Sequence, residues 1–504
     1  MLTLLCGLLC TNQPNILLIM VDDLGWRDTS VRNGPPEDQT QAQLHPPHIQ
    51  RLADEGMRLD QAYASGCVCT PTRASLLTGA APARHHITWW TLYHDRDTSG
   101  KHPTLRAPDW NKEGVQPSPD LLPERFRRAG YRTIHVGKAH WGAHGTPGSD
   151  PLQLGFDENI AGHGSGAPGS YRGIHRFKNA KSTTDFSKSS IWDVPGLEAY
   201  HDRDLFLTEA LAIEASRSME AAVASGEPFF LHFAPYAVHT PIMGNPRWID
   251  ETQGLAPVEA RYVSLVRSVD AAVGVLLDRL DALGITNNTV VVFTSDNGAV
   301  SGYAGRPANR NAPLRGSKSS PYEGGHRVPL IARWPQRIPA GASSEAMVVT
   351  HDLHPTLLRW VGLDAEERSV PDGLDISSIL LGEKDQLERF VVWHKPHRTG
   401  GQNGRFMPCT AIRMGDEKLI AWHAEQRFEL YNLQTDPGEQ HDLSQTQPER
   451  VRKLSRVLSD WCREAGAHAR ARGTNHARAV CESDVADALG RAERRHDVLS
   501  LIHI

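Results

Sequence analysis

The chain has few cysteines for its length, seven in 504 residues, and no strong excess of charge of either sign. A disulfide scaffold needs a dense, even set of cysteines, so this odd and scattered set argues against one. The formal net charge of −5 gives no basic footprint for nucleic acid. No apolar run approaches the ~20 residues that a helix needs to cross a bilayer. The composition therefore indicates a large globular protein with no integral membrane segment and no nucleic-acid partner.

The two ends of the chain differ in character from the rest. Residues 1–13, with the apolar run Leu2–Leu9, resemble the core of an export signal without its preceding positive charges, and we interpret them as a truncated signal. That interpretation predicts a periplasmic or extracellular protein; the alternative is that Met1 is a misplaced start. Residues 466–504 form an Ala/Arg/His-rich tail, and Leu499–Ile504 match one reading frame of a common sequencing-library adapter. We therefore expect the end of this tail to be an artefact.

Several continuous apolar runs end abruptly in polar residues, a pattern typical of strands buried on both faces. The run Asn15–Val21 leads into Asp22-Asp23, and similar runs lead towards Lys138, His239 and Asp296-Asn297. In open α/β sheets ligands bind outside the carboxyl ends of the strands, so these polar groups are expected to share one site.

Helical patterns lie between the predicted strands, as the apolar face that runs from Val266 to Leu283 and stops at Gly284 illustrates. The fold predicted is α/β, with a large mixed, mostly parallel sheet sandwiched by helices in residues 14–385. Residues 386–465, with shorter apolar segments and one amphipathic helix, predict a smaller α+β domain. Residues 141–193 are rich in glycine and serine, and we expect them to form long loops that influence specificity.

The most specific motif is the segment Cys69–Gly79. Pro71 suits the first turn of a helix, which places Cys69 at the positive end of that helix, where anions bind and nucleophiles are activated. A cysteine nucleophile would want a paired histidine. Cys67 and Cys69 could instead form a redox or metal-binding dithiol. The non-catalytic alternative is that Cys69 is a buried structural cysteine.

The motif Cys69-Thr-Pro-Thr-Arg73 resembles the C-x-P-[ST]-R signature of the formylglycine-dependent sulfatases, the arylsulfatase-like members of the alkaline-phosphatase superfamily. Thr72 stands where serine is most common and keeps its hydroxyl, and Ala139 stands where tryptophan is common. The resemblance implies that a separate maturation enzyme oxidises Cys69 to formylglycine, whose hydrate is the nucleophile. It extends from about Asn15 to Leu443 and includes Asp22-Asp23, Gly137-Lys-Ala-His140, His239-Thr-Pro241, Asp296-Asn-Gly298, Leu314-Arg-Gly-Ser-Lys318 and Tyr322-Glu-Gly-Gly325.

The acidic residues of these motifs are candidates for a metal site. Asp22, Asp23, Asp296 and Asn297 offer only oxygen ligands, which favours Ca²⁺, with Mg²⁺ as the alternative, over zinc. Three carboxylates packed together repel strongly unless a cation neutralises them. Each pair alone reads as a turn or a helix cap, and only their joint occurrence at strand ends favours a site. The resemblance implies that the modified Cys69 completes the coordination.

The resemblance also assigns catalytic roles. Arg73, Lys138 and Lys318 are expected to bind the oxygens of a sulfate ester and to stabilise developing charge. His239, with help from Lys318, is expected to protonate the leaving alkoxide, and His140 to accept a proton from the hydrate as sulfate is released. These two histidine assignments could be exchanged.

The sequence thus predicts an enzyme that hydrolyses sulfate monoesters and releases inorganic sulfate. A sulfated polysaccharide or its oligosaccharide ranks first as substrate, and a small aryl or alkyl sulfate second. A phosphodiesterase or phosphonate monoester hydrolase of the same superfamily is the nearest rival. The other alternative is an unmodified, inactive protein that binds sulfate esters.

Overall fold

The computed structural model describes residues 13–29, 31, 43–44, 46–100, 105–106, 108–179, 189–302, 310–363, 371–399, 406–467 and 471–472. The predicted export signal, apart from residue 13, and nearly all of the tail after residue 467 lie outside the described residues. No helix within the described ranges is long and apolar enough to cross a membrane.

Eight strands form one large sheet in the order β10-β2-β9-β8-β1-β7-β5-β6. The five strands from β8 to β6 run parallel, whereas β9 is antiparallel to both of its neighbours. The mixed, mostly parallel sheet predicted from the buried apolar runs is therefore confirmed. The strands are β1 (Asn15–Val21), β2 (Met57–Leu59), β5 (Arg132–Gly137), β6 (Glu158–Ile160), β7 (Phe229–Ala234), β8 (Thr289–Ser295), β9 (Leu330–Arg333) and β10 (Ala342–Ser344).

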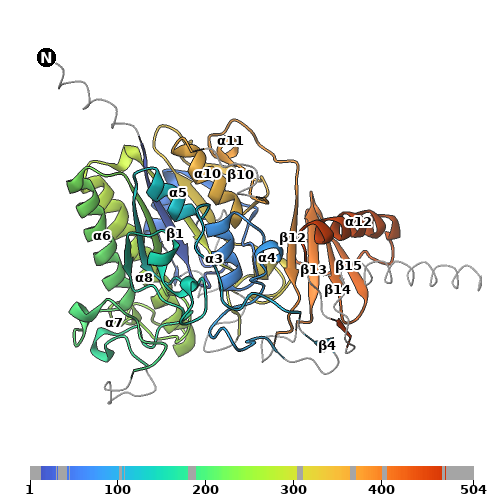
Figure 1. Cartoon of the computed structure of the whole chain (residues 1–504), viewed down its shortest axis with the longest axis horizontal. Coiled ribbons are helices and arrows are strands. Elements are labelled where there is room, and N and C mark those ends of the chain that lie inside the picture. The colour runs from blue at the N-terminus through green and yellow to red at the C-terminus, as the bar shows by residue number, and fades with distance from the viewer. Residues whose placement is uncertain are drawn as a thin grey trace, which may run out of the picture.

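Helices cover both faces of this sheet, and a hydrophobic core lies under each layer (Figure 1). The odd-numbered residues from Leu17 to Val21 pack in the core with α2 (Pro47–Asp54), α6 (Leu207–Ser225) and α8 (Pro257–Ala282). The even-numbered residues from Ile16 to Met20 pack in the other, with α3 (Cys69–Thr78), α5 (Leu122–Arg128) and α10 (Leu353–Trp360). Side chains of a strand alternate between faces, so β1 is apolar from Ile16 to Val21 because both of its faces are buried.

Helix α8 illustrates how far the sequence pattern reaches. It begins about two and a half turns before the predicted apolar face, with Pro257 in its first turn, where a missing N–H costs nothing. It ends at Ala282, and Gly284 follows in the left-handed region with a φ of 69°.

Shorter elements lie outside the two main sheets. Two-stranded sheets pair β3 (Ala62–Tyr63) with β11 (Val348–Val349) and β4 (Leu105–Arg106) with β16 (Ala471–Arg472). Short α-helices are α4 (Pro82–His85), α7 (Pro246–Ile249), α9 (Glu323–His326) and α11 (Ser377–Leu380). Short 3₁₀ turns are Pro147–Ser149, Pro151–Leu154, Gly173–His175, Glu198–Tyr200, Thr286–Asn288 and Thr350–Asp352.

The C-terminal part is a four-stranded antiparallel sheet with one helix, as the α+β prediction requires. Its strands β12 (Phe390–Lys395), β13 (Cys409–Met414), β14 (Glu417–Trp422) and β15 (Arg427–Asn432) pair in sequence order. One face packs against α12 (Pro448–Glu464). The other face contributes Trp393 and Tyr431 to a core that includes Tyr63 and Tyr322 of the large domain. The C-terminal sheet and the large domain therefore share a buried apolar interface.

A buried charge cluster also joins the two parts. Lys418 of β14 is fully buried, and its Nζ lies 2.9 Å from Glu323 Oε1 and 3.0 Å from Glu439 Oε1. The other carboxylate oxygen of Glu439 accepts the backbone N–H of Glu323 at 2.7 Å. Burial raises the pKa of Glu439 to about 7, although Lys418 opposes the shift. The segment that precedes α9, which carries Lys318, is thus fastened to the C-terminal sheet.

Replacing Lys418 by methionine tests this cluster. The variant removes the ammonium group that contacts both Glu323 and Glu439, and leaves Glu323 only the more distant Arg327 at 3.8 Å, so we expect the free energy of unfolding to fall by about 3–5 kcal/mol. Urea denaturation followed by tryptophan fluorescence measures the change. The control is Glu417→Gln on the same strand, which breaks only the partly exposed Arg450–Glu417 pair at 2.9 Å. The control should cost at most about 1 kcal/mol. Equal losses in both variants would contradict a structural role for the buried cluster.

Candidate active site

The acidic residues meet because β1 and β8 are neighbours in register. Val21 pairs with Ser295, so Asp22-Asp23 and Asp296-Asn297 leave the sheet side by side. The N–H of Asp23 donates to Asp296 Oδ1 at 3.1 Å, and Asn297 Nδ2 donates to Asp23 Oδ1 at 2.7 Å. All four side chains are fully buried. The expectation that these strand ends share one site agrees with this geometry.

Gly298 shows how closely the next motif approaches. A Cβ added at residue 298 would lie 1.9 Å from the carbonyl oxygen of Gly324, a distance that no side chain tolerates. The N–H of Gly298 also donates to the carbonyl of Gly325 at 3.1 Å. The Asp296-Asn-Gly298 and Tyr322-Glu-Gly-Gly325 motifs therefore pack backbone to backbone, which places the loop of Lys318 beside the acidic cluster.

Cys69 is the first residue of α3, and Val68 before it is extended and provides no side-chain cap. Its Sγ lies among the acids, since Asp22, Cys69 and Asp296 each offer a ligand atom within 4.8 Å of the others. The hydroxyl of Thr72 accepts the N–H of Gly66 at 2.9 Å and donates to the carbonyl of Gly66 at 3.1 Å. Thr72 thus closes the turn before Cys69 with the hydroxyl that serine would supply in its place.

Three basic side chains surround the acids. Arg73 Nε donates to Asp296 Oδ2 at 2.8 Å. Lys138 Nζ lies 2.7 Å from Asp22 Oδ2, and Lys318 Nζ lies 2.5 Å from Asp23 Oδ1 and 3.8 Å from the sulfur of Cys69. Each aspartate therefore has a close basic partner, and Lys138 also lies 4.0 Å from Asp296 Oδ2. Arg315, a weaker candidate in the same loop, instead donates to Tyr431 and to the carbonyl of Glu439.

Despite these partners, the charged forms of Asp22 and Asp296 remain disfavoured. Burial raises the pKa of Asp22 above its ordinary value, against the pull of Lys138 and with a further rise from Asp23. Burial and the charge of Asp22 also raise the pKa of Asp296. Burial disfavours the charged form of Lys318, but Asp23 and Cys69 outweigh it, so the pKa of Lys318 is raised. The cluster thus favours any additional positive charge.

The polar atoms that lack a partner fit a cation at this position. Asp22 Oδ1 and Asn297 Oδ1 are buried and accept no hydrogen bond from any described residue. An unsatisfied buried oxygen costs free energy, and here both are acceptors that a metal ion would use. A set dominated by carboxylate and amide oxygens suits a hard divalent cation. The residues present therefore fit a metal site.

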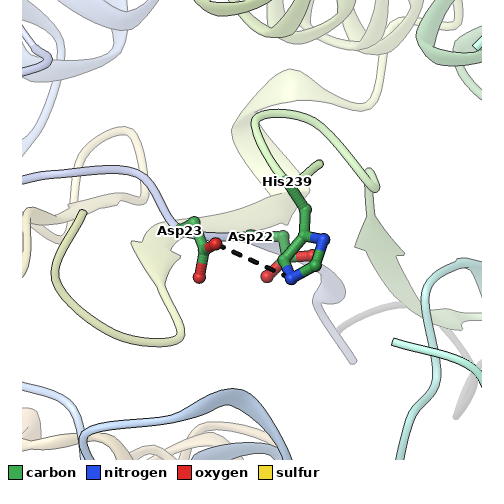
Figure 2. Close-up of side chains that lie close together, drawn as sticks. All are labelled: Asp22, Asp23 and His239. Carbon is green, nitrogen blue, oxygen red and sulfur yellow. Dashed lines mark ion pairs between the residues drawn. The ribbon is translucent and has the colours of Figure 1, made fainter. Parts of the chain in front are cut away.

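His239 lies at the edge of the cluster, with 18% of its side chain exposed. Its Nε2 is 3.7 Å from Asp23 Oδ2, and Figure 2 shows the ring facing the two aspartates. Asp22, Asp23 and His239 also offer ligand atoms within 4.8 Å of one another. This geometry allows His239 to act either as a proton donor or as a nitrogen ligand of the metal. The second role was not predicted, because the predicted metal site has only oxygen ligands.

His140 lies deeper in the protein. Its Nε2 is 2.9 Å from the carbonyl oxygen of Thr91 and 3.2 Å from Thr70 Oγ1. Burial, and then the charge of Lys138, hold the pKa of His140 well below its usual range, so the ring is neutral. Thr70 is the sequence neighbour of Cys69, so His140 contacts the residue next to Cys69. Among the described residues, the hydrogen bonds of its ring go to Thr70 and Thr91.

Some residues that support the site carry no motif. Asp28 is fully buried and accepts hydrogen bonds from the N–H of Gly25 at 2.7 Å, the hydroxyl of Tyr262 at 2.6 Å and the guanidinium of Arg310 at 2.7 Å. It therefore fixes the loop that follows Asp22-Asp23. Its side-chain partners Tyr262 and Arg310 lie more than 200 residues away in the sequence. A lone aspartate of this kind gives no local signal, and sequence reasoning missed it.

Comparison with known proteins gives consistent matches. The sulfatase family model matches residues 14–363, and the model described as N-sulphoglucosamine sulphohydrolase, C-terminal, matches residues 317–462. The chain is 33% identical over 472 residues to N-acetylgalactosamine-6-sulfatase of Canis lupus familiaris, covering 88% of this chain and 84% of that one. It is 29% identical to arylsulfatase G of Mus musculus over 437 residues, covering 78% and 73%. The structure of Ps i-CgsB in complex with k-i-k-neocarrahexaose has a TM-score of 0.74 at 25% identity, covering 95% of this chain and 98% of that one.

The metal site can be tested by titration. After chelation, adding a divalent cation should raise the stability of the protein, by about 2.7 kcal/mol when the free ion is ~100 times its Kd. Asp22→Asn, which removes one negative charge from the cluster, should lose most of this increment. Thermal melts and isothermal titration measure it. Asp270→Asn is the control, because Asp270 is buried but serves only the first turn of α2, where it accepts the N–H groups of His48 and Ile49. An increment that survives in Asp22→Asn would refute the site.

Proposed function

Because the chain belongs to the sulfatase family and is a sulfuric ester hydrolase, we propose that it removes sulfate from a carbohydrate alcohol at the cluster around Cys69. One observation carries this proposal. Cys69 opens a helix, lies within ligand distance of Asp22 and Asp296, and has Lys318 Nζ 3.8 Å from its sulfur. A residue in that place lies next to both a metal site and a helix N-terminus, which binds anions.

We propose that Cys69 is oxidised to formylglycine by a separate maturation enzyme, and that the hydrated aldehyde supplies the nucleophile for sulfur. We further propose that Asp22, Asp23, Asp296 and Asn297 hold Ca²⁺, with Mg²⁺ as the alternative, and that the ion supplies positive charge next to the bound ester. Oxygen ligands in a loop-built cluster suit the flexible coordination of Ca²⁺.

The charges of the cluster support the binding of an anion. Three aspartates and three basic side chains compensate each other in the protein alone. A divalent ion would make the site net positive, and a sulfate monoester carries one negative charge. In a buried site such attraction is strong because water screens it little. The basic side chains thus select an anionic ester over a neutral one.

Arg73 is the side chain best suited to hold a sulfate oxygen. Its Nε and Nη1 bind Asp296 and the carbonyl of Lys138, at 2.8 Å and 2.9 Å. Its Nη2 is buried without a partner among the described residues. A rigidly held donor aimed by two other bonds stabilises developing charge without reorganisation. Lys318, beside Cys69, is the second such donor.

The leaving alcohol of a sugar is a poor leaving group and needs a proton. We assign this role to His239, the partly exposed side chain at the edge of the cluster. We assign to His140 the role of the base that acts when sulfate is released; its ring is neutral, but burial and the charge of Lys138 disfavour its protonation, so a nearby negative charge must assist the transfer. Lys138 neutralises Asp22 and thereby keeps the acids together.

A sulfated carbohydrate is the substrate class that the relatives support. Several carry names of sulfatases that act on sulfated sugars, such as the N-acetylgalactosamine-6-sulfatases, which are up to 34% identical to this chain. A small aryl sulfate is the second candidate, supported by the arylsulfatase G relatives. We also propose export to the periplasm or the outside of the cell, where sulfated polysaccharides are met.

Maturation of Cys69 is open to direct measurement. Replacing CH₂SH by CHO lightens the tryptic peptide from Leu59 to Arg73 by about one water's mass, as the atomic composition of the two groups requires. Mass spectrometry of protein produced with a maturation enzyme should detect this form. Cys69→Ala should lower kcat at least ~1,000-fold, since covalent catalysis is lost. Cys67→Ala, in the same peptide, is the control and should keep most of the activity. A fully active enzyme with an unmodified Cys69 would refute the proposal.

A substrate panel separates the remaining functions. Sulfate release from sulfated mono- and oligosaccharides, from 4-nitrophenyl sulfate, and phosphate release from a phosphate diester should be compared at equal enzyme concentration. We expect the highest kcat/KM on a sugar sulfate, because its ring can use contacts beyond the sulfate group. Preference for the aryl ester would defeat the carbohydrate assignment, and preference for the diester would favour the phosphodiesterase rival. Binding without turnover after maturation would indicate an inactive binding protein.

A further inference from the structure

Tyr171 places its hydroxyl against the turn that carries His239. The oxygen lies 2.7 Å from the carbonyl oxygen of Tyr236 and 2.8 Å from the carbonyl oxygen of His239. The carbonyl of Tyr236 also accepts the N–H of His239 at 2.9 Å. One hydroxyl therefore bridges the start and the end of a four-residue turn after β7.

The same turn is fastened to the acidic cluster through its backbone. The N–H of Val238 donates to the carbonyl of Asp22 at 2.8 Å, and the N–H of Asp22 donates to the carbonyl of Ala237 at 3.3 Å. Tyr171 and Asp22 thus hold the turn through different groups. With both sets of hydrogen bonds in place, the backbone of residues 236–239 has little freedom to rotate.

The ring of His239 is held in one orientation. Its Nδ1 lies 3.1 Å from the carbonyl oxygen of Thr240 and 3.3 Å from Thr240 Oγ1, on the side away from the acids. Its Nε2 is the nitrogen that faces Asp23. Figure 2 shows the His239 ring beside the two aspartates, with its ion pair to Asp23 drawn as a dashed line. A shift of the backbone at residue 239 would therefore move the Nε2 that the proposed function uses.

Tyr171 is itself rigidly seated. It is fully buried, its ring stacks on Phe206 with centroids 5.3 Å apart, and its carbonyl accepts the N–H of Leu207 at the start of α6. A hydroxyl on a rigid aromatic ring, anchored to a long helix, can hold a loop at low entropic cost. Tyr171 also belongs to the glycine-rich segment 141–193, which links that segment to the site.

We propose that Tyr171 is a positioning residue for proton transfer at His239: its hydroxyl fixes the turn so that Nε2 stays directed at the reaction site. The inference rests on the proposed function, because it takes His239 as the proton donor to the leaving alcohol. Misplacement of a donor by a fraction of an ångström lowers the rate without weakening substrate binding.

The test uses Tyr171→Phe, which removes only the hydroxyl. The control is Tyr131→Phe, since Tyr131 is equally buried and its hydroxyl donates to the carbonyl of Pro14 at 3.0 Å. The substrates are a sugar sulfate, whose alkoxide needs a proton, and 4-nitrophenyl sulfate, whose phenolate leaves without one. His239→Ala serves as the benchmark for loss of the donor.

We expect Tyr171→Phe to lower kcat on the sugar ester about tenfold, which is a part of the ~100- to 10,000-fold that general-acid catalysis supplies in total. KM and the rate on the aryl ester should stay close to those of the control. The double variant Tyr171→Phe/His239→Ala should be no slower on the sugar ester than His239→Ala alone. This comparison of the double variant with His239→Ala uses the sugar ester alone, so it works even if the enzyme does not hydrolyse the aryl ester.

Two failures are distinguishable. If His239→Ala slows both esters equally, or slows neither, the donor assignment in the proposed function is wrong. If His239→Ala is selective but Tyr171→Phe slows both esters equally, or adds its full effect in the double variant, the positioning role is wrong. Should Tyr171→Phe not fold, Phe206→Leu loosens the ring stack instead. Phe206→Leu should then lower kcat on the sugar ester by less than tenfold and leave the rate on the aryl ester unchanged. An equal loss on both esters would overturn the inference.

Discussion

The compression of three carboxylates into a fully buried cluster at the ends of β1 and β8 is the constraint on which the site depends. Asp22, Asp23 and Asp296 are all fully buried, and their mutual repulsion would be prohibitive without compensation. Arg73, Lys138 and Lys318 supply it from three separate segments. The site is thus assembled by charge pairing as much as by apolar packing.

Much of this arrangement is predictable because it depends on strands that the sequence displays openly. Strands buried on both faces are continuous apolar runs, and polar residues that end such runs must meet at one edge of a parallel sheet. The side-by-side placement of Asp22-Asp23 and Asp296-Asn297 follows from that rule, and so does the position of Lys138 after β5. Cys69 at the start of α3 follows from the position of Pro71 two residues later.

The remaining structure could not be predicted, because its signals are single polar residues with distant partners. Lys418 and Glu323 are 95 positions apart, and Asp28 and Arg310 are 282 apart. Such residues look like ordinary surface charges until the fold buries them, and no periodicity marks them. The role of Tyr171 is harder still to predict, since its hydroxyl contacts the backbone carbonyls of Tyr236 and His239. Every residue type has a backbone carbonyl, so the sequence does not mark such an acceptor.

The pairing of every acid with a base has a consequence for the order of binding. Lys138 and Lys318 now direct their charge at Asp22 and Asp23, so an ester that arrives first must compete with those aspartates for the same ammonium groups. A divalent ion that binds the aspartates relieves the lysines of that pairing and leaves their charge available to the ester. The two ligands should therefore bind with positive coupling, and by linkage the ester should tighten the ion as much as the ion tightens the ester. The raised pKa values of Asp22 and Asp296 point the same way, because both carboxylates are short of positive charge even with every base in place.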